Sequence, residues 1–218
     1  MTAPAVGVLA LQGGVGPHLG AFAALGVAAR EVRRPSELDG LTHLVLPGGE
    51  STTLHHLLEL FALTDEIVRR HRSGELALFG TCAGAILLGR GDGERPPRFG
   101  LLDAVLERNA YGRQVDSFAE RIPFEVFGGE ELPCVFIRAP RFRRVGPGAR
   151  VLARRRGEPI LVAGPGLLAA TFHPELGGDP RIHRYFLRPE LWADHPAWRS
   201  QPGVLGEAAR TPAAFSSV

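Results

Sequence analysis

Lysine is absent from this chain of 218 residues, in which all 25 basic side chains are arginine. Schiff-base chemistry needs a lysine amine, and the phosphate-binding GxxxxGK[ST] loop needs its lysine. Both kinds of site are therefore excluded. The net charge is only +2, so we interpret the arginine clusters at 141–144 and 154–156 as solvated surface. A charge balance of this kind predicts no nucleic-acid partner.

Cysteine is scarce as well, with only Cys82 and Cys134. They stand in very different local sequences, so we expect two free thiols in a reducing compartment and no disulfide. No apolar run approaches the roughly 20 residues of a membrane helix. The N-terminus also lacks the basic start of a signal peptide. These absences predict a cytoplasmic protein that does not use a membrane.

The length fits one sizeable domain better than two small ones. We expect residues 1–188 to form this domain. Residues 189–218 mix Pro, Ala, Ser and Trp without periodicity, which predicts a loosely ordered tail. The alternative is a tail that docks through Trp192 and Trp198.

Apolar runs of strand length recur before turn-forming residues. They cover 6–11, 43–46, 76–79, 134–137, 151–153, 160–163 and 167–172. Helical spacing appears at 19–25 and 54–72, with Ser51 or Thr52 as the expected N-cap of the second helix. This alternation predicts an α/β fold: a mostly parallel central sheet with helices on both faces. Between 120 and 170 short strands predict a small antiparallel extension of the same sheet.

Cys82 stands where a predicted strand turns sharply into an apolar helix, in Gly80-Thr-Cys82-Ala-Gly84. This pattern is typical of a nucleophile elbow, in which the nucleophile has a strained backbone and its small neighbours pack closely. The N-terminus of the following helix would favour a thiolate. The alternative is an ordinary buried cysteine, which is the commoner fate of a lone thiol.

His173 and Glu175 follow another predicted strand, in His173-Pro-Glu175. Side chains two positions apart in an extended chain point to the same side, so Glu175 can orient the imidazole while its other nitrogen faces a thiol. A structural histidine or a pair of metal ligands would produce the same pattern. Metal sites usually need three or four ligands, and the sequence has no dense Cys/His cluster, so no metal is expected.

A glycine-rich junction, Pro47-Gly-Gly49-Glu50-Ser51-Thr52, separates the second predicted strand from its helix. The amide of Gly49 and that of Ala83, the residue after the nucleophile, are positioned to form an oxyanion hole for acyl transfer. An ordinary turn that caps the helix is the alternative, and it is compatible with this role.

These elements, in this order, resemble the class I glutamine amidotransferases, which hydrolyse glutamine to glutamate and ammonia with a Cys-His-Glu triad. Several blocks narrow the resemblance to the glutaminase subunits of pyridoxal 5′-phosphate synthase. These blocks are 7–13, 47–52, 80–84, 107–118, 135–140 and 172–176. The elbow also differs from the Cys-Leu-Gly type of glutaminases that serve histidine, tryptophan or nucleotide synthesis.

The resemblance implies the flavodoxin-like, three-layer fold of class I glutamine amidotransferases and a triad of Cys82, His173 and Glu175. It implies no cofactor. It also implies a pocket for L-glutamine, formed by Gly49, Glu50, Ser51, Arg108, Ile137 and Arg138.

A partner is implied too, a (β/α)₈ synthase subunit in a large hetero-oligomer, which builds the vitamin from ribose 5-phosphate and glyceraldehyde 3-phosphate with the ammonia released here. Gln12 and His18 would lie in a loop that faces this partner. The family commonly has Glu before that histidine, whereas this chain has Pro17. The missing lysine is consistent with covalent sugar chemistry on the partner.

Two alternatives stay open at this point. A cysteine peptidase or a thiol-stress protein can share the sheet architecture and the elbow, but neither explains residues 108–118 or Ile137-Arg138. A non-catalytic scaffold that has kept the fold is the second alternative. The intact Cys-His-Glu set speaks against it.

Overall fold

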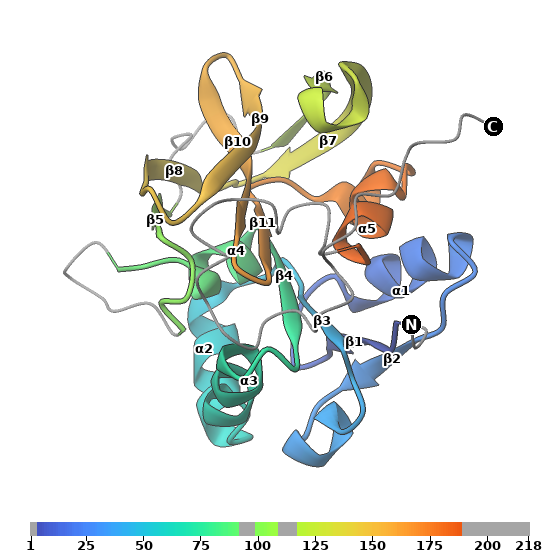
Figure 1. The fold of residues 1–218 in the computed structure, drawn as a ribbon, viewed down its shortest axis with the longest axis vertical. Helices are drawn as coiled ribbons and strands as arrows, with labels where there is room; N and C mark the ends of the chain where they lie inside the picture. Colours follow the sequence, from blue (N-terminus) through green and yellow to red (C-terminus); the bar gives the residue numbers. More distant parts are fainter. Residues whose placement is uncertain (1–3, 92–98, 109–116, 189–218) are drawn as a thin grey trace.

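A seven-stranded sheet forms the centre of the computed structural model, which describes residues 4–91, 99–108 and 117–188 (Figure 1). Its strand order is β2-β1-β3-β4-β11-β10-β9, and the first five of these strands are parallel. The strands are β1 (Val6–Leu9), β2 (Ala29–Val32), β3 (His43–Leu46), β4 (Ala77–Thr81), β9 (Arg150–Arg155), β10 (Glu158–Gly164) and β11 (Leu167–Ala170). The parallel part follows the doubly wound order of flavodoxin-like sheets, in which ligands bind beyond the carboxyl ends of the strands.

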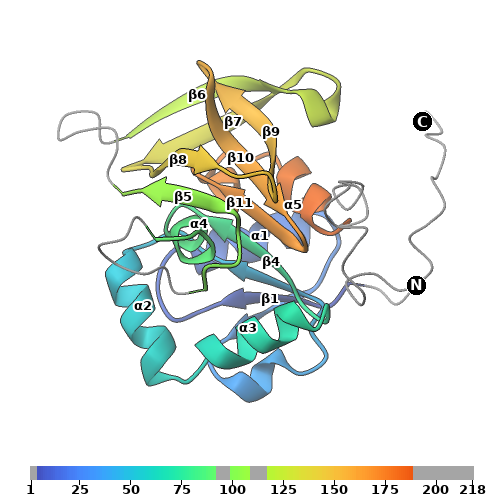
Figure 2. The same ribbon diagram turned by 60° about the vertical axis from the view of Figure 1, so that its left-hand side comes forward.

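Helices cover both faces of this sheet (Figure 2). They are α1 (Val15–Ala24), α2 (Ser51–Leu60), α3 (Thr64–Arg72), α4 (Ala83–Leu88) and α5 (Arg181–Phe186). Successive side chains of a strand point to opposite faces, so each strand feeds two cores. In β3, Val45 packs in the core under α1 and α5, whereas Leu44 and Leu46 pack in the core under α2, α3 and α4. Three layers result, as the sequence predicts.

The antiparallel region differs in part from the prediction. β9 and β10 do extend the central sheet. β6 (Ser117–Phe124) and β7 (Glu130–Ile137) instead form a separate hairpin, and β5 (Ala104–Glu107) pairs with β8 (Arg141–Val145). Alternate side chains of β7, including Cys134 and Phe136, pack down into the core, so the hairpin lies over the central sheet and cannot continue its edge.

The helix predicted over 54–72 is wrong as a single element. α2 ends at Leu60, Ala62 has a φ of 53°, and α3 begins at Thr64. The apolar stripe of α2 contains Leu54 and Leu58, but the next buried pair is Leu63 and Ile67. A step of five residues between the pairs does not match the helical period, so one straight helix cannot bury both.

Three short 3₁₀ turns complete the described chain: η1 (Pro35–Leu38), η2 (Glu125–Phe127) and η3 (Pro174–Leu176). Among the described residues, no helix is long and apolar enough to cross a membrane. The predicted tail at 189–218 lies outside the described residues.

Candidate active site

Cys82 occupies the turn between β4 and α4. Its backbone has φ 47° and ψ −102°, a strained conformation for a residue with a side chain. The Cys82 amide donates a hydrogen bond of 2.8 Å to the carbonyl of Ala170 at the end of β11, which fixes the turn. A Cβ atom at Gly80 would lie 2.5 Å from the carbonyl carbon of Gly84. The small residues on both sides of the thiol are therefore required by close backbone packing.

His173 follows β11, and its backbone is hydrogen-bonded to the neighbouring β6–β7 hairpin. Its amide donates to the carbonyl of Val135 in β7 at 2.7 Å. Its ring Nδ1 donates to Oε1 of Glu175 at 2.7 Å, and the Glu175 side chain is 1% exposed. With Nδ1 engaged, the other ring nitrogen is available to Cys82, whose side chain raises the pKa of the imidazole. The structure thus brings together the three residues predicted as a triad.

The electrostatic setting of His173 favours a charged ring. Burial acts to lower the pKa of His173, but the hydrogen bonds with Cys82 and Glu175 outweigh burial and raise that pKa. A protonated imidazole can give its proton to a leaving group, and the neighbouring sulfur is the nucleophile of the pair. The arrangement can therefore attack an acyl carbon and then protonate a leaving group.

The glycine loop after β3 lies against the same residues. A Cβ atom at Gly48 would overlap Cε1 of His173 and lie 3.2 Å from Cβ of Cys82. The Gly48 amide donates to Oγ1 of Thr81 at 3.0 Å, and its carbonyl accepts from the amide of Gly14 at 3.1 Å. The loop is thereby pinned beside the thiol, and the predicted oxyanion hole stays a prediction.

Ala83, the second residue predicted for the oxyanion hole, is the first residue of α4. The first amides of a helix have no partner within the helix and remain available to a ligand. Gly49, on the other side, is packed against Gln12: a Cβ atom at Gly49 would lie 2.5 Å from the Gln12 Oε1.

The N-cap of α2 differs from the prediction. Glu50, and neither Ser51 nor Thr52, is the N-cap: its carboxylate accepts from the amide of Thr52 at 3.2 Å and that of Thr53 at 2.6 Å. The bond from Thr53 is the main reason that the pKa of Glu50 falls to about 2. The carboxylate of Glu50 is therefore engaged with the helix, and its backbone amide donates to Oε1 of Gln12 at 3.0 Å, so contact of Glu50 with glutamine stays a prediction.

Ser51 does not cap the helix, and its side chain makes a hydrogen bond elsewhere. It is buried, and its Oγ accepts a hydrogen bond from the guanidinium of Arg108, which also reaches Oγ1 of Thr52 at 3.4 Å. Two residues predicted for the glutamine pocket thus meet. Residues 109–116 of the predicted block 107–118 lie outside the described residues.

Ile137 and Arg138 border the thiol from the end of β7. The carbonyl oxygen of Ile137 lies 3.9 Å from Sγ of Cys82. Arg138 is exposed and has a φ of 43°, so the chain turns sharply directly beside the nucleophile. Strained residues at such positions cluster at functional sites.

The structure places His18 in helix α1 and not in the predicted loop, and contact of this segment with a partner stays a prediction. His18 is fully buried in α1 because its ring points inward, where Nδ1 lies 2.8 Å from Nε2 of His183 and Nε2 lies 3.5 Å from Oε2 of Glu175. Gln12 is half-buried, and its Oε1 accepts from the Glu50 amide at 3.0 Å. Partner contact by Gln12 stays a prediction. His183 was missed, since nothing in the sequence around it indicates a site.

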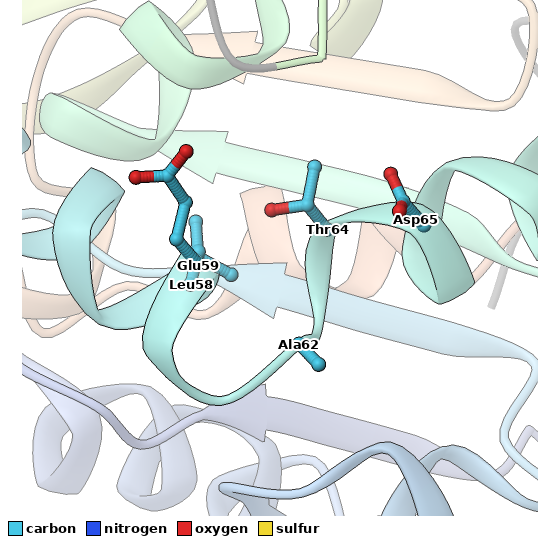
Figure 3. A pocket seen from close by; sticks show the side chains of 5 residues that line it. All are labelled: Leu58, Glu59, Ala62, Thr64 and Asp65. Atoms are coloured by element: carbon cyan, nitrogen blue, oxygen red, sulfur yellow. The ribbon is translucent and has the colours of Figure 1, made fainter.

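A surface hollow of about 440 Å³ lies elsewhere, at the turn between α2 and α3 (Figure 3). It is lined by Leu58, Glu59, Ala62, Thr64 and Asp65. None of these residues belongs to the predicted site, and the hollow is at the opposite end of α2 from Ser51. In the described ranges, no cluster of three metal-ligating side chains occurs.

A family model described as the SNO glutamine amidotransferase family matches residues 8–191 of the chain. The chain belongs to this family. Pyridoxal 5′-phosphate synthase subunit PdxT of Thermus thermophilus is 54% identical over 185 residues, which cover 84% of this chain and 95% of that protein. The protein of the same name from Pelotomaculum thermopropionicum is 52% identical over 186 residues, which cover 84% and 93%.

Solved structures agree with this membership. A crystal structure of a glutamine amidotransferase matches with a TM-score of 0.80 and 52% identity, covering 84% of this chain and 97% of that chain. A glutamine amidotransferase of Thermotoga maritima matches with a TM-score of 0.55 at 14% identity over 92% of this chain and 96% of that chain, and this likeness shows the fold alone. The predicted fold class and the predicted enzyme class, a glutamine amidotransferase, are confirmed.

Proposed function

We propose that the chain hydrolyses L-glutamine with Cys82, His173 and Glu175 and delivers the ammonia to a pyridoxal 5′-phosphate synthase subunit. The observation that carries this proposal is the bond of 2.7 Å from Nδ1 of His173 to Glu175, with the same ring and the side chain of Cys82 both packed against Gly48. This is the order of contacts that a nucleophile, its base and an orienting acid require.

Hydrolysis proceeds in two halves. The thiolate of Cys82 attacks the side-chain amide carbon of glutamine, and the amides of Gly49 and Ala83 stabilise the oxyanion. The carbon–nitrogen bond breaks as His173 gives its proton to the leaving nitrogen, which departs as ammonia. Water, deprotonated by His173, then adds to the thioester carbon. The carbon–sulfur bond breaks, glutamate leaves, and the thiolate is restored.

Substrate binding is assigned to residues on two sides of the thiol. Arg108, which donates to the Ser51 Oγ, supplies a positive charge for the α-carboxylate of glutamine. The backbone of Gly49 and Glu50, with Ile137 and Arg138 at the end of β7, closes the pocket around the amide. The 3.9 Å between the Ile137 carbonyl and Sγ of Cys82 supports this placement.

The partner is proposed from the relatives, which carry the name of a pyridoxal 5′-phosphate synthase subunit. We assign it the (β/α)₈ architecture, a large hetero-oligomeric assembly with this chain and a cytoplasmic location. Residues 1–188 would carry the whole glutaminase activity. A family match that ends at residue 191 supports this division.

Glutamate release in the presence of the synthase subunit tests the proposal. Cys82→Ala should abolish release, whereas Cys134→Ala should leave it near the wild-type rate. Cys134 is the matched control because it is fully buried in β7 and burial raises its pKa to about 12. Unimpaired turnover by Cys82→Ala would overturn the mechanism. Turnover of peptides without any response to glutamine would favour a cysteine peptidase instead.

A further inference from the structure

Behind the triad, a line of hydrogen-bonding rings continues from Glu175 into the space between α1 and α5. His18 and His183 are both fully buried there, with Nδ1 of His18 at 2.8 Å from Nε2 of His183. Nε2 of His18 lies 3.2 Å from Oγ1 of Thr81 and 3.5 Å from Oε2 of Glu175. No step of the glutaminase mechanism uses either ring.

We propose that His18 is a positioning residue that directs its Nε2–H to Glu175, and that His183 fixes this tautomer by donating to the His18 Nδ1. The inference rests on the proposed function, because it gives these rings a role in orienting the triad. It adds two residues, from α1 and α5, to the machinery behind Cys82.

Each of the two rings carries a single N–H. Burial, followed by the neighbouring His183 and His173, holds the pKa of His18 well below its ordinary value. Burial likewise lowers the pKa of His183 to about 4. Both rings are therefore neutral near pH 7. Each ring carries one proton, either on Nδ1 or on Nε2. The short contact between the rings allows two arrangements.

In the first arrangement, the His18 Nδ1 donates to the His183 Nε2. The His183 proton is then on Nδ1, a buried atom without a hydrogen-bond partner in the described part of the chain. At the same time an unprotonated Nε2 of His18 faces Oε2 of Glu175, an oxygen that itself lacks a hydrogen-bond partner among the described residues. A buried orphan N–H and an unsolvated carboxylate oxygen are both costly.

In the second arrangement, the His183 Nε2–H donates to the His18 Nδ1, and the His18 Nε2–H is shared between Thr81 and Glu175. The lone pair of the His183 Nδ1 stays unused, and the Thr81 hydroxyl, which now accepts from His18 as well as from Gly48, loses the His18 nitrogen as the acceptor of its own proton. This arrangement thus leaves one orphan donor, whereas the first leaves an orphan donor and an unsolvated carboxylate oxygen. The carboxylate oxygen gains its missing donor. The geometry therefore selects the second arrangement.

The consequence is a continuous chain from His183 through His18, Glu175 and His173 to Cys82. A donor on Oε2 restricts rotation of the Glu175 carboxylate, which keeps Oε1 on the His173 Nδ1 and the other ring nitrogen on the thiol. The same His18 N–H reaches Thr81, whose Oγ1 holds the amide of Gly48 in the glycine loop. His18 thus joins the acid of the triad to the oxyanion loop.

The tautomer can be measured on the full chain alone. Two-bond ¹H–¹⁵N correlation spectra at neutral pH, assigned by comparison with His18→Gln, should show a protonated Nε2 and an unprotonated Nδ1 for His18. A protonated Nδ1 at His18 overturns the inference. This measurement needs no turnover, so it is separate from the test of the glutaminase reaction.

Kinetics in the complex with the synthase subunit test the positioning role. The amide of His18→Gln reaches the place of Nε2, whereas the amide of His18→Asn reaches only the place of Nδ1. We expect His18→Asn to lower kcat by about tenfold with little change in KM for glutamine, the scale on which outer hydrogen-bond partners act. His18→Gln should keep kcat within about twofold of wild type, because it retains the donor to Glu175.

His43→Leu is the matched control for loss of a buried histidine. His43 is 7% exposed at the start of β3, and its Nδ1 bonds to the hydroxyl of the adjacent Thr42, away from the triad, so kcat should not change. Equal losses in the Gln and Asn variants, or a kcat that follows the unfolding midpoint of each variant, overturn the inference. If the wild-type complex releases no glutamate while the Nε2–H is observed, the proposed function fails and the tautomer assignment stands.

Discussion

The carbonyl of Leu46, at the end of β3, packs directly on Gly84 of α4: a Cβ atom at position 84 would overlap its oxygen and lie 2.7 Å from its carbon. The contact joins the strand that carries the glycine loop to the helix that follows the nucleophile. The glycine loop after β3 and the nucleophile turn before α4 therefore both depend on the absence of a side chain at position 84.

Gly84→Ala should accordingly destabilise the protein by about 3 kcal/mol, because the clash is with backbone that cannot rotate away. Urea unfolding followed by circular dichroism measures the change. Gly20→Ala is the control: nothing lies within 4 Å of a Cβ atom there, in an exposed position of α1, and alanine favours a helix over glycine by up to about 1 kcal/mol. Equal stability of the two variants would contradict the packing argument.

Much of this site is predictable from sequence because its signals are local. A strand, small residues and a thiol in direct succession define the elbow, and His173 and Glu175 stand only two positions apart in the chain. The extended segment expected there is wrong, since Glu175 lies in the 3₁₀ turn η3, which still brings the carboxylate to the imidazole. The boundaries of β3 coincide with its apolar run for the same reason.

The remaining features depend on tertiary packing. Three polar residues in a row can cap α2, and only the backbone angles select Glu50. The glycine-rich sequence around His18 predicts a surface loop, yet α1 turns this ring inward against α5, an element 165 residues further along the chain at His183. Buried and exposed residues alternate along β6 and β7, as in any half-buried strand. This alternation does not reveal whether the strands pair with the central sheet or lie over it.

Arg108 offers a test of substrate binding. Arg108→Gln should raise KM for glutamine by at least about tenfold with a smaller effect on kcat, because a charge-assisted bond to a carboxylate is lost from ground state and transition state alike. Steady-state glutamate release at varied glutamine concentrations separates the two constants.

The control for Arg108 is Arg154→Gln. Arg154 is exposed in β9, where it donates to the carbonyl of Gly157, and its replacement should leave both constants unchanged. A fall in kcat with KM unchanged in Arg108→Gln would instead place this residue in the chemical step.

The buried ring of His43 should make the free energy of unfolding fall in acid. Burial lowers its pKa to about 4, below the ordinary value of 6.5, so between these values the unfolded chain binds a proton that the folded chain does not. Stability is therefore present above pH 6.5 and is lost as pH falls towards 4, at about 1.4 kcal/mol per pH unit for one such group. His43→Leu should flatten the dependence of the unfolding free energy on pH by this slope.

Urea unfolding at several pH values between about 4 and 7 measures that difference. The wild-type protein under the same conditions serves as the comparison. A His43→Leu curve that is parallel to the wild type would contradict the assignment of a neutral, buried ring.

Thr81 connects the nucleophile strand to the oxyanion loop, since its Oγ1 accepts the amide proton of Gly48 at 3.0 Å. Thr81→Val keeps the shape of the side chain and removes this acceptor, which leaves a buried amide unpaired beside Cys82. The loop should lose its fixed position, and kcat for glutamine should fall by about tenfold, which is less than the loss of an oxyanion-hole donor itself would cause.

Thr171→Val is the matched control for Thr81→Val, because Thr171 is equally buried but reaches only the carbonyl of Ile160 at 3.5 Å. Glutamate release by both variants, in the complex with the synthase subunit, gives the comparison. If both valine variants turn over glutamine at the wild-type rate, the Gly48 amide does not need Thr81, and the other bonds of the loop, from the Gly14 amide to the Gly48 carbonyl and from the Glu50 amide to Gln12, are sufficient to hold it.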